Sequence, residues 1–152
     1  MIKNNLHSDK QFGYKKNHST EHLLLKIIDN LLRNCDNGLP TVVLLLDLSA
    51  AFDTVDHRTL LNILQHDIGV TGTALKWFES FLTNRTFNVK VGESYSEETE
   101  LPYGVAQGSV SGPRLFNIYT KSLGKYVEPA KFTIEGFADD HQLLKQFLPL
   151  LQ

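Results

Sequence analysis

The sequence predicts an α+β fold, and three observations favour this class. Apolar residues recur every three or four positions in several segments, as they do in amphipathic helices. Other segments are short, apolar and rich in β-branched or alternating apolar residues, as strands are. The expected order is helix, strand, two helices, hairpin, helix and hairpin, which is an α+β pattern.

The first expected helix follows a polar start, residues 1–10, for which we expect a frayed or disordered segment. Ser19 is a suitable N-cap, and Glu21 stands in the first turn, where the helix dipole favours a negative charge. Apolar residues then recur at helical spacing over 23–32. Asp36-Asn37-Gly38 is expected to end the helix.

The expected strands and helices after this point are short. Thr41–Leu48 is an apolar, β-branched run, which predicts a strand buried on both faces. Phe87, Val89 and Val91 alternate with other residues, as in a half-buried strand. The remaining expected elements are helices at 56–65, 73–82 and 113–123, a return strand at 99–105 after a turn at 92–98, and a hairpin of 131–137 with 141–144.

Length and composition indicate one domain of ordinary soluble type. The chain has 152 residues, 41% of them hydrophobic and 21% charged, and residues 11–152 show no linker. No apolar run reaches the ~18 residues of a membrane helix, and no signal core is visible, so we expect an intracellular protein of the nucleus or cytoplasm. The single cysteine, Cys35, excludes an internal disulfide. The net charge of −2 gives no basic footprint for nucleic acid.

Three aspartates stand where predicted strands end. Asp47 closes the first strand, and Asp139 and Asp140 lie between the last two. A buried carboxylate is costly unless it is paired or binds a metal, and three of them suit a hard cation such as Mg²⁺. Two ions about 3.5–4 Å apart can clamp the attacking and leaving oxygens of a phosphoryl transfer. Taken singly, each aspartate also fits an ordinary turn or cap.

Four segments carry a resemblance to a known family. They are, in chain order, QFGYKKNHSTEHLLL, LLLDLSAAFDTVDHRTLL, GVAQGSVSGPRLFNIY and FADD. Together they resemble the reverse transcriptase domain of non-LTR (LINE-type) retrotransposons, from Gln11 to Leu144. The resemblance implies part of a polymerase palm, an antiparallel sheet with packed helices, plus part of the fingers and no thumb. The domain would span residues 11–152.

The resemblance implies an RNA-directed DNA polymerase, a nucleotidyltransferase that adds dNTPs to a primer 3′-hydroxyl. Asp47 and Asp139 match the main ligands of two Mg²⁺ ions, with Mn²⁺ as an alternative, and Asp140 matches the third carboxylate. The expected partners are an RNA template, a DNA primer, dNTPs and the rest of the retrotransposon polyprotein. No membrane partner is expected.

Four further residues match positions that contact the nucleotide in this family. Phe52 matches an aromatic sugar gate, which would clash with a ribonucleotide 2′-hydroxyl; the alternative is an ordinary core aromatic. Gln107 and Gly108 match a loop that approaches nucleotide and template; the alternative is a plain turn before a helix. Lys15 stands where the family has arginine at a triphosphate contact, so it keeps the charge but not the bidentate fork.

The sequence also departs from the family. Some positions carry another residue than the usual one: Ala106 for proline, Ser111 for leucine, Phe137 for tyrosine and His141 for threonine. No metal ligand is lost. The later palm strand, primer grip and thumb have no counterpart after Asp140, so we expect a fragment with weak or no activity alone.

Two other functions fit parts of the sequence. His18-Ser19-Thr20-Glu21-His22 spells H-x-x-E-H, a zinc-protease pattern, but a Ser19 N-cap would leave His18 outside the helix and off the face of His22. The second alternative is a catalytically inactive retrotransposon remnant that acts at most as an RNA- or protein-binding module.

Overall fold

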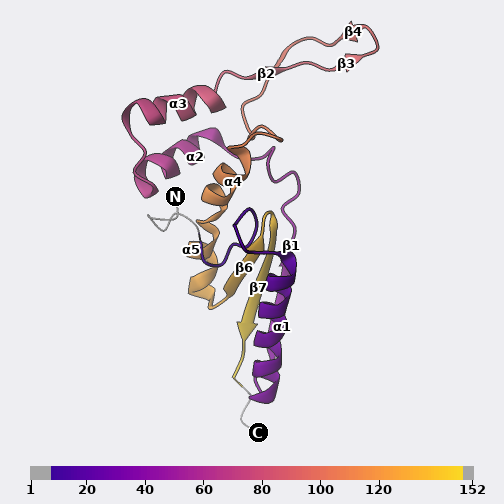
Figure 1. Cartoon of the computed structure of the whole chain (residues 1–152), viewed down its shortest axis with the longest axis vertical. Helices are drawn as coiled ribbons and strands as arrows, with labels where there is room; N and C mark the ends of the chain where they lie inside the picture. Colours follow the sequence, from indigo (N-terminus) through magenta and orange to yellow (C-terminus); the bar gives the residue numbers. More distant parts are fainter. Residues whose placement is uncertain (1–7, 149–152) are drawn as a thin grey trace. The chain divides into compact units, whose positions relative to one another are not determined.

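The protein has a mixed helix and sheet fold, compatible with the predicted α+β class (Figure 1). The computed structural model describes residues 8–148. The chain divides into two compact units, Met1–Ser49 with Thr120–Gln152, and Ala50–Tyr119. The predicted frayed start, residues 1–10, lies mostly outside the described residues.

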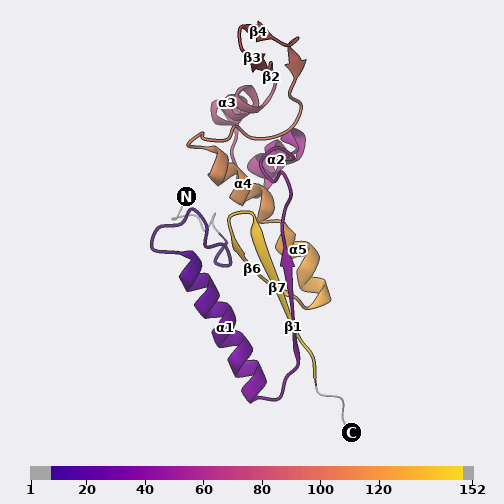
Figure 2. The ribbon, with the colours of Figure 1, turned by 90° about the vertical axis from the view of Figure 1, so that its right-hand side faces the viewer.

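The first unit is built on a three-stranded antiparallel sheet. Its elements are α1 (Thr20–Asp36), β1 (Thr41–Leu46), α5 (Leu123–Val127), a 3₁₀ turn (Glu128–Ala130), β6 (Thr133–Phe137) and β7 (Asp140–Gln146). The strand order is β1-β7-β6, and β1 pairs with β7 from Thr41↔Gln146 to Leu46↔His141. Figure 2 shows α1 and α5 on opposite sides of this sheet. The predicted last hairpin is confirmed.

Helix α1 begins and ends where the sequence predicts. The Ser19 side chain accepts a hydrogen bond from the His22 N–H, and the C-cap is Asn37. Hydrogen bonding to Ser19 lowers the pKa of Glu21 in the first turn. The inner face of the helix packs in a small apolar core, whose buried members are Phe12, Leu23, Ile27 and Leu144.

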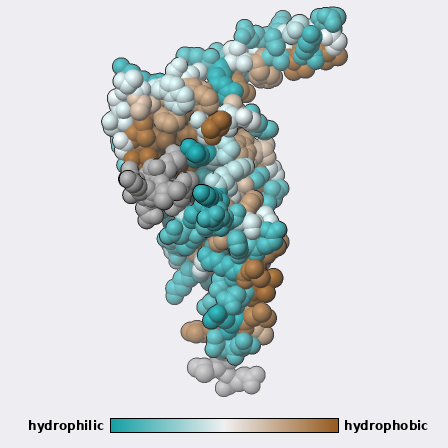
Figure 3. Space-filling view, in the orientation of Figure 1, coloured by the Kyte–Doolittle hydropathy of each residue, from teal (hydrophilic) through white to brown (hydrophobic). Residues whose placement is uncertain are grey.

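The prediction that the first strand is buried on both faces is wrong. β1 ends at Leu46 rather than Leu48, and most of it is exposed, with Leu45 77% exposed. Side-chain burial depends on what packs over the faces of a strand, and most β1 side chains are left exposed; β1 also lies at the edge of the sheet, paired with β7 alone among the described strands. Apolar side chains on α1, such as Leu25 and Ile28, are also exposed, and Figure 3 shows hydrophobic residues gathered over α1.

The second unit is mainly helical. Its elements are α2 (His57–Asn62), a π-helical turn (Ile63–Asp67), α3 (Gly72–Leu82), β2 (Thr86–Phe87), β3 (Lys90–Val91), β4 (Ser94–Tyr95), β5 (Thr99–Glu100) and α4 (Gly112–Thr120). The predicted helices at 56–65 and 73–82 are confirmed, with Asp56 as the N-cap of α2. The helix predicted at 113–123 ends earlier, at Thr120. Large side chains buried in this unit include Leu60, Leu82 and Phe116.

The hairpin between α3 and α4 differs from the prediction. Phe87, Val89 and Val91 are 47%, 53% and 74% exposed rather than half-buried. The hairpin consists of two-residue ladders, β2 with β5 and β3 with β4, and all of these strand residues are exposed. The alternating pattern therefore marks strands but not a buried face. No helix within residues 8–148 has the length and apolar character needed to cross a membrane.

Candidate active site

The three aspartates lie at the same end of the first unit's sheet. The last β1–β7 pair is Leu46↔His141; Asp47 directly follows Leu46, and Asp140 directly precedes His141. β6 and β7 close with the pair Phe137↔Asp140, so Asp139 lies in the turn between them. Residues about 90 apart in the sequence are thus neighbours because two antiparallel pairings share β7.

The carboxylates share this end of the sheet without forming a closed cluster. Asp47 and Asp140 are exposed, and Asp139 is half-buried. Within residues 8–148, no three His, Cys, Asp or Glu side chains are gathered closely enough to hold a metal ion. The donor set itself fits, because carboxylate oxygens are the ligands that hard divalent cations prefer. Exposed aspartate side chains can also change rotamer toward a shared ion.

The turn that carries Asp139 is bound by Gln11, which the sequence motifs did not single out. Gln11 is buried, and its Oε1 accepts hydrogen bonds from the N–H of Ala138 (2.9 Å) and of Gly13 (2.7 Å). Its Nε2 donates to the carbonyl of Ala138 at 3.0 Å. Sequence patterns report neighbours along the chain, and this partner lies 127 residues away.

Lys15, which was expected at the triphosphate, and its neighbour Tyr14 follow Gln11 closely in the chain. The side chain of Lys15 lies with Nζ 4.0 Å from a carboxylate oxygen of Asp9 and is 26% exposed. Its role at a triphosphate stays a prediction. Burial, and then the negative charge of Asp139, raise the pKa of Tyr14, so the Tyr14 hydroxyl lies within the electrostatic field of the candidate site.

Phe52 belongs to the second unit, where it packs against a helix. Its ring stacks on Phe116 of α4, with 4.7 Å between ring centroids, and it is half-buried. The Phe52 carbonyl accepts a hydrogen bond from the Val105 N–H at 2.8 Å. Gly104 makes this approach possible, because a Cβ there would lie 3.1 Å from the Cα of Asp53. The backbones around 52 and 105 are therefore tied together.

Gln107 and Gly108 form a turn on the segment that is tied to Phe52. The Gln107 side-chain amide donates to the Asp53 carboxylate at 3.2 Å. Gly108 has φ +76°, and the space around its absent Cβ is open. Glycine adopts this conformation without the steric cost that other residues have. The structure thus brings together three of the predicted nucleotide-contacting residues within the second unit.

The comparisons with known proteins agree with these motifs. The family model described as reverse transcriptase (RNA-dependent DNA polymerase) matches residues 1–147. The chain belongs to the reverse transcriptase family. The match extends across both units and covers all four motifs and the elements that link them. Enzymes of this family generally use divalent metal ions, a nucleic-acid template and primer, and nucleotides.

Several similar proteins belong to mobile elements. Two are from Drosophila melanogaster: "Probable RNA-directed DNA polymerase from transposon BS", 30% identical over 95% of this chain, and "RNA-directed DNA polymerase from mobile element jockey", 30% identical over 93%. The chain spans 16% of the length of each. A Pol polyprotein of the type-1 retrotransposable element R2 from Popillia japonica is 30% identical over 68% of the chain and is 16% covered. The predicted resemblance to non-LTR retrotransposons is confirmed.

The position of His18 in this structure does not support the zinc-protease alternative. α1 begins at Thr20 with Ser19 as its N-cap, so His18 precedes the helix. The His18 ring nitrogen Nδ1 lies 3.0 Å from the carbonyl of Lys16. Zinc requires its ligands to converge on one point, and an H-x-x-E-H pattern supplies them only when both histidines share a helix face.

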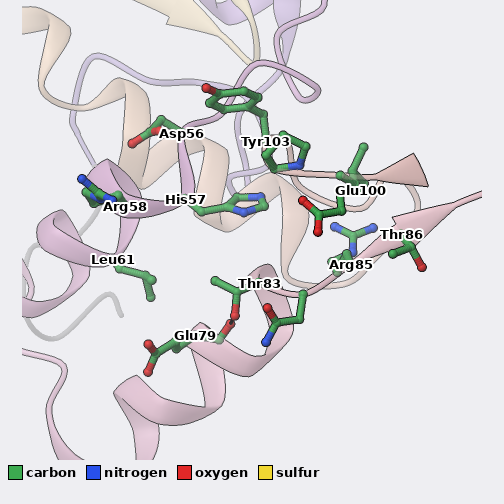
Figure 4. Close-up of a pocket in the computed structure, with 13 residues that line it drawn as sticks. Asp56, His57, Arg58, Leu61, Glu79, Thr83, Arg85, Thr86, Glu100 and Tyr103 are labelled. Atoms are coloured by element: carbon green, nitrogen blue, oxygen red, sulfur yellow. Dashed lines mark hydrogen bonds between the residues drawn. The ribbon is translucent and has the colours of Figure 1, made fainter. Parts of the chain in front are cut away.

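A cleft of about 870 Å³ lies in the second unit of this reverse transcriptase domain (Figure 4). Side chains of both signs line it, including Arg58, Glu79, Arg85 and Glu100. His57 is buried at its wall, with Nε2 2.7 Å from the Gly104 carbonyl. The cleft therefore shares a wall with the segment that leads to the Gln107 turn, and nothing in the sequence predicted it.

Proposed function

We propose that this chain is the catalytic part of an RNA-directed DNA polymerase that transfers nucleotides onto a primer 3′-hydroxyl by a two-metal mechanism. The observation that supports it is the β1-β7-β6 register, in which Asp47 and Asp140 each adjoin the last β1–β7 pair, Leu46↔His141, and Asp139 lies in the adjoining turn. The chain spans 16% of its relatives' length, so we propose weak or no activity for it alone.

The three carboxylates would act as ligands. Asp47 and Asp139 would each supply oxygens to two Mg²⁺ ions, and Asp140 would supply the third carboxylate. When bound, such ions activate the primer hydroxyl and neutralise the charge that develops on the triphosphate. The end of a short antiparallel sheet suits this role, because Asp140 begins β7 and Asp47 and Asp139 directly adjoin strand residues or the turn between strands.

The second unit would contribute nucleotide selection. The Phe52 ring would lie under the sugar and exclude a 2′-hydroxyl, and its stacking on Phe116 supports a fixed ring position. The open, positive-φ backbone at Gly108 would let the Gln107 turn approach nucleotide and template. Lys15, a residue of the first unit, would contact the triphosphate as a point charge.

The remaining expectations follow from the family and are proposals for this chain. We propose an RNA template, a DNA primer and dNTPs as substrates. The other segments of a retrotransposon polyprotein would be its partners, in the nucleus or cytoplasm. The larger part of such a protein would have to hold the duplex, because template and primer are retained by basic contacts against salt competition.

The direct test is single-nucleotide addition to a primer on an RNA template, with Mg²⁺ or Mn²⁺. Wild-type protein is compared with Asp139→Asn, and with Asp36→Asn as a control that removes the same charge at the end of α1. Any addition, which we expect to be weak, should be abolished by Asp139→Asn and retained by Asp36→Asn. Equal incorporation by all three proteins would instead support a catalytically inactive remnant.

A further inference from the structure

The turn that carries Asp139 contains a backbone conformation that is unfavourable by itself. Ala138 has φ +58°, a left-handed conformation that non-glycine residues rarely adopt, and it is buried. Such a conformation persists when its surroundings impose it. In this structure the Gln11 side chain binds both the N–H and the carbonyl of Ala138. The residue directly before Asp139 is therefore fixed on both sides of its Cα by one amide.

The segment around Gln11 is itself attached to β6. The Phe12 N–H donates to the Gly136 carbonyl at 2.7 Å, and the Gly136 N–H donates to the Lys10 carbonyl at 2.8 Å. Gly13 lies against the turn so closely that a Cβ there would be 2.3 Å from the Ala138 nitrogen. The segment that carries Gln11 is therefore fixed in register against β6 and the turn.

The other side of Asp139 is also held. The His141 ring nitrogen Nδ1 lies 2.9 Å from the Asp139 carbonyl, and His141 is buried beside Gly136. The Gln11 amide and the His141 ring thus act on the two peptide groups that flank the Asp139 Cα. The position of the Asp139 carboxylate depends on that Cα and on one side-chain rotamer.

We propose that Gln11 is a positioning residue for the metal site: its amide sets the Ala138–Asp139 backbone, and through it the Asp139 carboxylate. This inference rests on the proposed metal-binding function. Gln11 would not touch the metal. Residues of this kind, which orient a metal ligand from behind, typically change metal affinity by about 10- to 100-fold when they are replaced.

The sheet offers a matched control for burial and hydrogen bonding. Asn34 is 7% exposed, against 8% for Gln11. Its Nδ2 donates to Thr41 Oγ1 at 3.0 Å, and its Oδ1 accepts from Gln146 Nε2 at 2.8 Å, at the opposite end of the same sheet. Replacing Asn34 also removes a buried amide from this unit, but it leaves the Asp139 turn intact.

The test is Mn²⁺ affinity of the full 152-residue chain, measured from free Mn²⁺ by electron paramagnetic resonance. The variants are Gln11→Met, which keeps the side-chain length without hydrogen bonds, Asn34→Leu and Asp139→Asn, each at a temperature where circular dichroism shows it folded. We expect Asp139→Asn to abolish the site and Gln11→Met to weaken it by about 10-fold or more. Asn34→Leu should stay within about twofold of wild type, because distant sites act independently.

The outcomes separate the two proposals. If Mn²⁺ binding depends on Asp139 but Gln11→Met does not weaken it, the role of Gln11 is wrong and the metal site stands. The same holds if Asn34→Leu weakens binding as much as Gln11→Met does. If wild-type protein shows no Mn²⁺ binding that depends on Asp139, the proposed metal site is wrong, and so is the role of Gln11. Should Gln11→Met not fold, Gln11→Asn carries the same test, because its amide is one methylene too short to hold both groups of Ala138.

Discussion

Each end of the β1-β7-β6 sheet is stabilised by one buried side-chain amide, but the two ends differ in the number of carboxylates beside them. At one end the buried amide of Gln11 binds the β6–β7 turn. At the other end the buried amide of Asn34 joins α1 to the first pair of β1 and β7. Three carboxylates, of Asp47, Asp139 and Asp140, adjoin the first end.

The difference shows how a stable sheet end can also carry chemistry. At the Asn34 end, polar groups are satisfied by each other, since Asn34 binds both Thr41 and Gln146. At the Gln11 end, the amide satisfies backbone groups only, and the aspartate side chains remain outside the buried network. Rigid backbone beneath accessible carboxylates is what a metal or substrate site requires.

The largest loss of stability is expected when a methyl group is added beside Gln11, at Gly13. Gly13→Ala places a Cβ 2.3 Å from the Ala138 nitrogen, so the turn and its partner segment must separate. We expect the free energy of unfolding to fall by about 3 kcal/mol, as for severe overpacking. Urea denaturation measures it. Unchanged stability would mean that the two segments do not pack as described.

The matched substitution at the other end is Gly38→Ala. Gly38 has φ +64° and nothing within 4 Å of its would-be Cβ, so the new methyl group meets only backbone strain. The expected loss in the free energy of unfolding is about 1 kcal/mol. A loss as large as that of Gly13→Ala would show that crowding does not distinguish the two ends.

An intermediate effect is expected for the ion pair that joins α1 to β6. Lys26 Nζ lies 2.8 Å from the carboxylate of Glu135, which is 3% exposed, whereas the Lys26 side chain is 41% exposed. Lys26→Met leaves a buried carboxylate without its cation. We expect a loss of about 2 kcal/mol, below the value for fully buried pairs because water reaches Lys26.

A double-mutant cycle separates the charge from the packing in this pair. Lys26→Met combined with Glu135→Gln should recover part of the loss, because the uncompensated charge is gone. Additive losses in urea denaturation would instead assign the effect to packing of the Lys26 stem against Phe12, over whose ring Nζ lies at 5.3 Å.

An effect as small as that of Gly38→Ala is expected for a polar contact that is exposed rather than buried. The Asp56 carboxylate caps α2, and hydrogen bonds from Thr59, first from its side chain and then from its N–H, lower the pKa of Asp56. Asp56→Ala should cost about 1 kcal/mol at neutral pH. Because the folded pKa lies below 3.8, this contribution is complete above that pH and is lost as pH falls through the folded pKa.

The pH profile gives the control for this prediction. Asp56→Asn keeps a capping oxygen but cannot titrate, so it should match wild type near neutrality. The stability difference between wild type and Asp56→Ala should shrink below about pH 4, measured by thermal unfolding. A difference that stays constant down to pH 2 would contradict a charged cap.

The sequence predicts local features of this molecule well. Ser19 and the periodicity of α1 locate that helix, because capping and amphipathic spacing act over a few residues. Burial is less predictable. The composition of 41–48 is that of a central strand, yet β1 is an edge strand, and its exposure depends on what packs over its faces.

In the candidate site too, local features could be predicted from the sequence and long-range contacts could not. Motifs locate the three aspartates, and the hairpin pattern places Asp139 and Asp140 at a turn. Gln11 is the first residue of a family motif, but neither motif nor periodicity indicates its contact with the turn, because that contact depends on a left-handed Ala138 and spans most of the chain. The cleft beside His57 likewise arises from segments that only the fold brings together.

The most direct test of the central claim is where Mn²⁺ binds on the sheet. Substoichiometric Mn²⁺ added to ¹⁵N-labelled protein broadens the amide resonances nearest to the ion. We predict that Asp47, Asp139 and Asp140 broaden first and together, while Thr41 and Gln146 at the other end stay sharp. Broadening that is equal at both ends, or that leaves the three aspartates sharp, would contradict a metal site at this end of the sheet.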